Sequence, residues 1–169
     1  YETVFFNLPP GLGSCMQWDR KLDARLAFGI LSIHAQKAVE IGDGFAGALL
    51  LGSKVHDEIF YSRSRGFYRR TNRSGGIEGG MTTGSPVVVR GAMKPISTLL
   101  KPLRSVDFKT RKATISRYER SDVCALPAAS IVAEGVVAFV LADAFLEKFS
   151  GDHLKDVAAA VQHFRRRIR

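Results

Sequence analysis

The sequence is poor in cysteine and has no long, uninterrupted hydrophobic run. Its two cysteines, Cys15 and Cys124, lie far apart, which excludes a disulfide-stapled scaffold and fits reduced thiols in the cytoplasm. The most apolar stretch, residues 123–149, is interrupted by three acidic side chains. It lacks the unbroken run of about 18 apolar residues that a transmembrane helix needs, so we expect no membrane span.

Acidic residues are also scarce relative to basic ones, at 16 against 25, which gives a net charge of +9. This balance favours anionic partners, namely nucleic acid, an acidic membrane surface, or small phosphorylated or carboxylated ligands, and charge alone does not choose among them. Nucleic-acid binding favours aromatic side chains interleaved with the basic ones, and only Phe164 lies near the basic C-terminal tail. We therefore expect neither nucleic acid nor a membrane as the partner.

The length of 169 residues, 46% of them hydrophobic, predicts one globular domain spanning residues 1–169. Hydrophobic periodicity predicts helices over residues 19–33, capped by Asp19, and 152–167, capped by Asp152. A third helix, over residues 127–149, is apolar on nearly all sides, and we expect it to be buried on most of them. Short strands are predicted at residues 1–8, 39–41, 59–61, 67–69 and 86–93, with a hairpin over 105–116. Short strands with segregated helices indicate an α+β fold.

Three segments carry residue types that suit ligand chemistry. The glycine-rich loop over residues 75–84 fits neither the dinucleotide-binding nor the P-loop spacing, and a bulged strand connection explains it about as well as ligand binding. Lys94, followed by Ser97 and Thr98 after a strand, suits an oxyanion or a phosphate, but an ordinary turn explains it too. Arg120 and Asp122 precede an apolar helix, where an anion is favoured and a structural ion pair is the alternative.

The contiguous residues His56-Asp57-Glu58 are of types that bind metals. Neighbouring residues on a strand or helix point in different directions, and the sequence has no second cluster to complete a site. We therefore expect no metal centre.

Taken together, six blocks of sequence resemble the chorismate synthase family, in the same order and over most of the chain. These blocks are GLGS (11–14), WDRKLD (18–23), VEIGDGF (39–45), TNRSGGIEGGM (71–81), RGAMKPIST (90–98) and RSDVCALPAA (120–129). Family members are much longer than this chain, and the matching part resembles their C-terminal portion. The resemblance implies an antiparallel sheet packed on a helical core, roughly one half of the family's β-α-β sandwich.

The resemblance also implies an activity. Chorismate synthase is a carbon–oxygen lyase that converts 5-enolpyruvylshikimate 3-phosphate to chorismate and phosphate by 1,4-elimination, at the end of the shikimate pathway of aromatic amino acid biosynthesis. The family is a cytoplasmic flavoprotein that requires reduced FMN, with NADPH as the associated reductant, and it assembles as a homotetramer.

By similarity, the residues of this chain divide into cofactor contacts and catalytic groups. Arg120 matches an arginine at the junction of flavin and substrate, and Asp122 matches an aspartate that manages the proton at flavin N5. His34 and Ala35 stand where the family commonly has Asn-Ala, Gln-Ala or Pro-Ala beside the flavin, so His34 is a departure. The implied cofactor-binding residues are His34, Ala35, Gly79, Lys94, Pro95, Ile96, Ser97, Thr98 and Arg120.

The family's Gly-Glu-Ser-His-Gly segment and its two catalytic histidines belong to its N-terminal half and do not occur in this sequence. A site without them loses most of its transition-state stabilisation, so we expect the 169-residue chain alone to be inactive. The alternative is a non-catalytic truncated paralogue that serves as an oligomer-interface or flavin-binding module.

Overall fold

A three-stranded antiparallel sheet lies at the centre of the structure, a computed structural model that describes residues 1–119 and 124–168. Strand β7 (Val87–Met93) runs between β1 (Glu2–Phe5) and β2 (Gln36–Ile41). Val87 and Val89 are fully buried and alternate with half-buried Val88 and Arg90, as expected for a strand with one face on the core. The α+β prediction and all the strands predicted for this sheet are confirmed.

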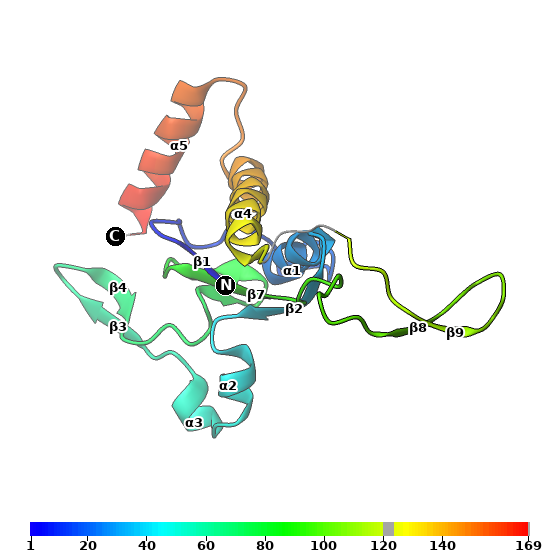
Figure 1. Cartoon of the computed structure of the whole chain (residues 1–169). Helices are drawn as coiled ribbons and strands as arrows, with labels where there is room; N and C mark the ends of the chain where they lie inside the picture. The colour runs from blue at the N-terminus through cyan, green and yellow to red at the C-terminus, as the bar shows by residue number, and fades with distance from the viewer. Residues whose placement is uncertain (120–123, 169) are drawn as a thin grey trace.

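Two helices cover one face of this sheet. Figure 1 shows α1 (Leu22–Ser32) and α4 (Leu126–Lys148) above it, crossing close to one another. Leu22, Leu26 and Ile30 form a fully buried stripe along α1 at spacings of four residues. A Cβ on Gly29 would lie 2.9 Å from Val136 Cγ1, so glycine is what lets the two helices approach closely at this point.

The prediction that the long apolar helix is buried on most sides is wrong. Its buried residues form one stripe, and apolar side chains elsewhere on α4 stay exposed, including Ile131 at 68% and Phe139 at 77%. A nearly uniform apolar sequence does not reveal which faces have a neighbour. Among the described residues α4 packs on α1 and β1, and its C-terminal end packs on Phe164 of the last helix. The buried stripe consists of Ala129, Ala133, Val137, Leu141 and Ala144.

By length and composition alone, α4 is also long and apolar enough to cross a membrane, a test that the core helix of a soluble protein passes too. Its packing is that of a helix in a globular unit. Asp143 pairs with Arg25 of α1, and Glu147 pairs with both Arg20 and Arg25.

Two predicted helix caps are also wrong. The N-cap of α1 is Lys21, whose side chain makes no capping bond, and Asp19 lies outside the helix. Helix α5 (Leu154–Arg167) begins after His153, whose Nδ1 accepts a hydrogen bond from the Lys155 N–H at 3.1 Å, in place of Asp152. Histidine is an uncommon N-cap, which is why the sequence favours the neighbouring aspartate.

Short helices and hairpins surround this core. Helices α2 (Gly44–Ala48) and α3 (Gly52–Val55) lie below the sheet, on the side opposite α1 and α4 (Figure 1). Two hairpins, β3 (Ile59–Ser62) with β4 (Gly66–Arg69) and β5 (Ile77–Glu78) with β6 (Met81–Thr82), pair as antiparallel ribbons. The first of them confirms the strands predicted at 59–61 and 67–69.

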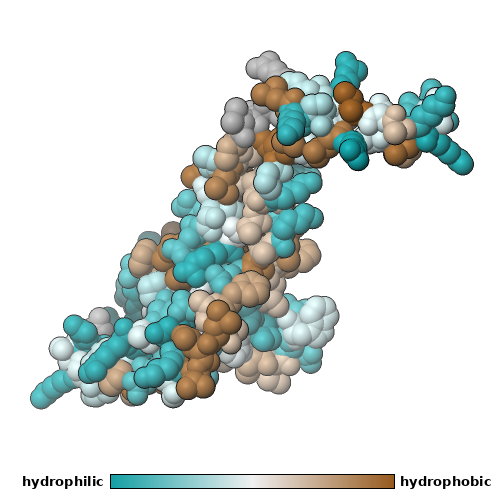
Figure 2. All heavy atoms as spheres, turned by 60° about the horizontal axis from the view of Figure 1, so that its bottom comes forward, coloured by the Kyte–Doolittle hydropathy of each residue, from teal (hydrophilic) through white to brown (hydrophobic). Residues whose placement is uncertain are grey.

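The predicted hairpin over 105–116 forms an arm that projects from the body of the molecule (Figure 1). Strands β8 (Arg104–Val106) and β9 (Ala113–Ile115) pair with Val106 opposite Ala113, and every residue of both strands is exposed. Hydrophobic and hydrophilic residues alternate over the arm, which extends to the right in Figure 2.

Candidate functional site

Two of the predicted cofactor-binding segments meet where strand β2 begins and strand β7 ends. The Lys94 N–H donates a hydrogen bond of 2.9 Å to the Ala35 carbonyl oxygen. The two residues meet because β2 and β7 are antiparallel, with Gln36 opposite Met93, so the start of one strand lies beside the end of the other. The pairing register shifts between Gln36 and Ala38, which inserts Lys37 as an extra residue beside this contact.

The backbone at this junction is held in an uncommon conformation. Ala35 has a φ of +64°, in the left-handed region that non-glycine residues seldom adopt. It links the end of α1 to β2 within three residues, and the preceding His34 is exposed. A left-handed alanine between a helix and a strand turns its carbonyl toward Lys94 and leaves the His34 side chain on the surface.

Residues 94–98 continue from β7 as an irregular segment on the surface. Lys94, Pro95 and Ser97 are exposed, whereas Ile96 and Thr98 are half-buried. The segment therefore presents one ammonium group and one hydroxyl group to solvent, with an apolar side chain turned toward the body. A cation and a hydroxyl so placed can bind the oxygens of a phosphate.

Gly79 lies apart from this junction. It occupies the turn between β5 and β6 with a φ of +59°, and no atom lies within 4 Å of the place where a Cβ would be. The neighbouring Gly80 carbonyl accepts the Leu22 N–H at 2.9 Å, so the turn lies at the start of α1, whereas Ala35 follows the helix's end. Eleven residues of helix separate the two by about 16 Å.

The structure thus brings His34, Ala35 and Lys94 together and places Gly79 at the other end of α1. The two predicted catalytic residues, Arg120 and Asp122, lie outside the described residues.

The segment that leads into the glycine-rich loop, residues 71–74, is held by a carboxylate that the sequence did not single out for this role. Asp57, which is buried, accepts hydrogen bonds from the Thr71 hydroxyl at 2.5 Å and from the backbone N–H groups of Arg73 and Ser74, both at 2.9 Å. Burial acts to raise the pKa of Asp57, but these donors together outweigh it and hold the pKa below its usual value. The carboxylate therefore faces the loop, and a single acidic residue 14 to 17 positions upstream gives no sequence signal of that contact.

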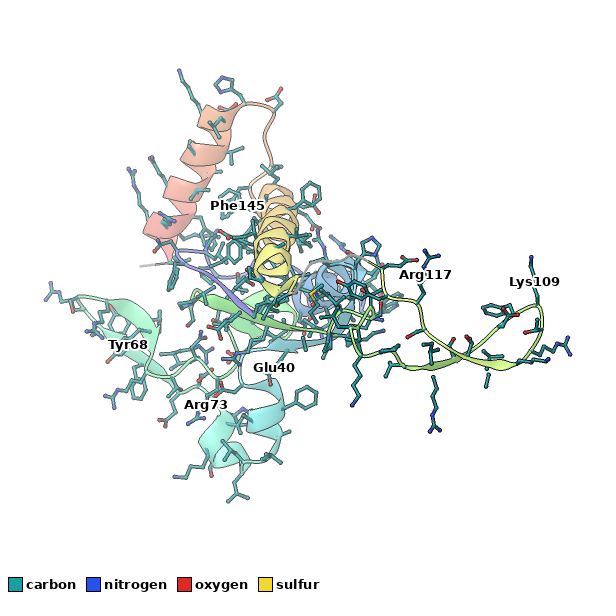
Figure 3. The ribbon with its side chains drawn as sticks, in the orientation of Figure 1. Glu40, Tyr68, Arg73, Lys109, Arg117 and Phe145 are labelled. Atoms are coloured by element: carbon teal, nitrogen blue, oxygen red, sulfur yellow. The ribbon has the colours of Figure 1, made fainter. Side chains whose placement is uncertain are left out.

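A second network joins the loop to the sheet. Arg90 of β7 pairs with Glu2 of β1 at 2.7 Å and with Glu40 of β2 at 3.1 Å, and so connects all three strands. The Phe45 N–H and then Arg90 lower the pKa of Glu40, while Arg73 pairs with Asp43 at 3.3 Å. Glu40 and Arg73 both lie on the α2 side of the sheet (Figure 3). Because these charges have partners, we interpret the network as support for the loop.

Gly42 and Gly75 touch where this loop crosses the end of β2. Both have positive φ, at +59° and +62°, and a Cβ on either would lie 2.3 Å from a backbone nitrogen on the other side. Only glycine satisfies both conditions, so this part of the glycine-rich loop serves a close backbone approach.

Comparisons with known proteins agree with this architecture. A family model described as chorismate synthase matches residues 1–146. The chain is 54% identical over 169 residues to the chorismate synthase of Desulforamulus reducens, covering 100% of this chain and 44% of that protein. It is 57% identical over 170 residues to that of Geotalea uraniireducens, covering 96% and 43% respectively.

A crystal structure of chorismate synthase superposes with a TM-score of 0.83 and 44% sequence identity, covering 99% of this chain and 43% of that one. The chain thus spans less than half the length of the relatives it matches. The likeness in sequence extends over nearly the whole of the described fold, and the chain belongs to the chorismate synthase family.

Proposed function

We propose that this chain is the C-terminal part of an enzyme that converts 5-enolpyruvylshikimate 3-phosphate to chorismate and phosphate with reduced FMN. Membership of the family supports the reaction class, a carbon–oxygen lyase of the shikimate pathway. The observation that carries the proposal for this chain is the hydrogen bond between Lys94 and Ala35, because it unites two segments that the resemblance assigns to the flavin. We further propose that the complete protein is a cytoplasmic homotetramer.

The residues present suit FMN as a ligand. The exposed ammonium of Lys94 and the hydroxyl of Ser97 match the flavin's phosphate group, and the Lys94 N–H is bonded to the adjoining turn at Ala35. Gly79 leaves open space on the surface for close approach by another part of the ligand. An elongated, phosphorylated cofactor suits two binding segments that lie at opposite ends of one helix.

When bound, reduced FMN supplies the electron-rich ring that the elimination requires, although the reaction is redox-neutral overall. Of the residues outside the described part, Arg120 is proposed to pair with an anionic group of the substrate and Asp122 to hold the proton at flavin N5. The role of Lys94 is to bind and orient the cofactor phosphate. None of these groups replaces the histidines that the resemblance assigns to the family's N-terminal half, so the chain alone is proposed to be inactive.

The test is chorismate formation under anaerobic conditions from the enolpyruvyl substrate and reduced FMN. The chain alone, a family N-terminal half alone and their mixture are compared, and we expect product only from the mixture. Lys94→Ala in the mixture should raise the FMN concentration for half-maximal activity at least about tenfold. Lys101→Ala, an exposed lysine seven residues on, is the matched control. Product from the chain alone would show that the missing histidines are not needed.

The second candidate is a non-catalytic module that keeps an interface. The exposed apolar side chains of Ile131, Val132 and Phe139 on α4 favour it, because such a face is typical of an interaction surface. This function predicts a mixture that forms a complex by size-exclusion chromatography and yet makes no chorismate.

A further inference from the structure

A cleft of about 930 Å³ opens between the β3–β4 hairpin, the loops at residues 7–10 and 83–85, and the C-terminal end of α5. Figure 3 shows Tyr68 on the hairpin that forms one wall. The volume falls within the range of small-molecule sites in proteins, roughly 300 to 1,000 Å³. None of the predicted flavin contacts that the structure describes lines the cleft.

The charged side chains that line this cleft, among the described residues, are all positive. Its charged lining residues among those described are three arginines, Arg65 and Arg69 from the hairpin and Arg165 from α5. Arg69 already pairs with Glu78 at 2.8 Å. Within the described residues, Arg65 and Arg165 have no carboxylate within 4 Å. Two uncompensated guanidinium groups on opposite walls favour an anion between them.

Both walls are attached to the body of the protein. The Arg69 guanidinium donates to the Asp57 carbonyl as well as to Glu78, which ties the hairpin to the loop below it. On the other wall, Arg165 Nη2 lies 3.4 Å from the Asn7 carbonyl. The cleft is therefore a preformed feature of the fold, which lowers the entropic cost of binding.

The rest of the lining combines apolar and aromatic side chains with the polar Asn7, Thr83 and Ser85. The Phe67 side chain is 71% exposed, and Leu8, Pro10 and Ile59 add further apolar surface. Arg65 lies over the Tyr68 ring, 5.3 Å from its centroid, so its planar group is already oriented by stacking. Strand alternation puts Phe67 on the opposite face of the hairpin from Tyr68 and Arg65, and residues of both faces line the cleft. A phenyl ring and a cation in one cleft suit a ligand that has both a planar ring and an anionic group.

The cleft and the Lys94 junction are separated by the length of β7. Ser85, which lines the cleft, precedes this strand, and Lys94 follows it. Seven residues of strand separate them by about 24 Å. One small ligand does not reach both places.

We propose that this cleft binds a second small ligand, a phosphate monoester that carries a planar ring, with Arg65 and Arg165 on the phosphate and Phe67 on the ring. The site is independent of the proposed flavin contacts and of the proposed activity. FMN belongs to the same chemical class, so the experiment must distinguish the two sites.

The probe is adenosine monophosphate, titrated by isothermal calorimetry into the chain alone and into its assembly with the N-terminal half. We expect saturable binding that Arg65→Gln weakens at least about tenfold, the value of one charged hydrogen bond. Arg63→Gln removes a neighbouring, exposed arginine that does not line the cleft, and it should change the dissociation constant less than twofold. Lys94→Ala should also leave it unchanged, which separates the cleft from the flavin contacts.

Two further comparisons test the ring and the phosphate separately. Phe67→Ala should weaken adenosine monophosphate but not inorganic phosphate, while Phe108→Ala, fully exposed on the β8–β9 arm, should affect neither. Adenosine without its phosphate should bind more weakly than the monophosphate. The proposal is overturned if the monophosphate does not saturate, if Arg63→Gln weakens it as much as Arg65→Gln, or if adenosine binds equally well.

Discussion

A single buried carboxylate, Asp57, holds the segment that leads into the glycine-rich loop. Its hydrogen bonds come from residues 71–74, which begin the block 71–81 that carries much of the resemblance to the family. Because its pKa is lower in the folded than in the unfolded chain, it stabilises the fold at neutral pH. That contribution is lost as the pH falls from about 4 through the folded pKa.

Asp57→Asn should therefore lower the free energy of unfolding by about 2 kcal/mol at pH 7, because three donors lose a charged acceptor. The variant should also lose part of the wild-type dependence of stability on pH below about 4. Urea denaturation between pH 3 and 7 measures both effects. Asp107→Asn is the control, since Asp107 also accepts bonds from its own turn but is exposed. Equal losses from the two variants would contradict the role given to Asp57.

Substitutions at Gly75 and Gly66 distinguish the cost of backbone strain from the cost of steric overlap. Both have positive φ, at +62° and +68°, but a Cβ on Gly75 would lie 2.3 Å from Gly42 N, whereas one on Gly66 meets nothing within 4 Å. Gly66→Ala should cost about 1 kcal/mol, from strain alone. Gly75→Ala should cost at least about 3 kcal/mol, because the backbone at Gly42 must move. Thermal unfolding of the two variants makes the comparison, and similar melting temperatures would show that the overlap is relieved at no cost.

At the scale of whole elements, α1 and α4 are joined by buried apolar contacts and by exposed ion pairs. Leu26 is fully buried, whereas Arg25 pairs with Asp143 and Glu147, whose side chains are 64% and 45% exposed. Solvent and salt screen pairs of this kind.

Leu26→Ala should destabilise the chain by about 2–5 kcal/mol, and Arg25→Met by no more than about 1 kcal/mol. The loss from Arg25→Met should shrink further in 1 M NaCl, whereas the loss from Leu26→Ala should persist. Chemical denaturation at low and high salt tests this, and a larger loss from Arg25→Met would mean that the ion pairs dominate the contact.

Sequence patterns predicted most helices and strands because periodicity is a local property. Sequence patterns do not predict contacts between residues far apart in the chain. Ala35 and Lys94 meet only because β2 pairs with β7, and Asp57 contacts residues 71–74 across an intervening hairpin. The exposed face of α4 was missed because a uniformly apolar helix carries no mark of which side has a neighbour. For the candidate site, residue types alone left turns and ion pairs as alternatives, and the family resemblance supplied the roles.

At the scale of the whole molecule, the exposed apolar face of α4 is one surface without a partner in the described chain. If the proposed N-terminal half covers it, Phe139→Asp should prevent that association while leaving the chain alone folded, since this side chain is 77% exposed. Size-exclusion chromatography of the mixture and circular dichroism of the chain measure the two effects. Phe108→Asp, on the β8–β9 arm, should form the complex normally. Complex formation by the Phe139 variant would place the partner elsewhere.

The strand order β1–β7–β2 affects how the chain folds while the ribosome synthesises it. Thr3 of β1 pairs with Val89 of β7, so within the described chain β1 has no strand partner until 86 further residues have been made. At translation rates of about 5 to 20 residues per second, this interval lasts roughly 4 to 17 seconds. During it, the nascent chain carries β1, α1 and β2 without the strand that joins them, and their apolar faces are open to chaperones.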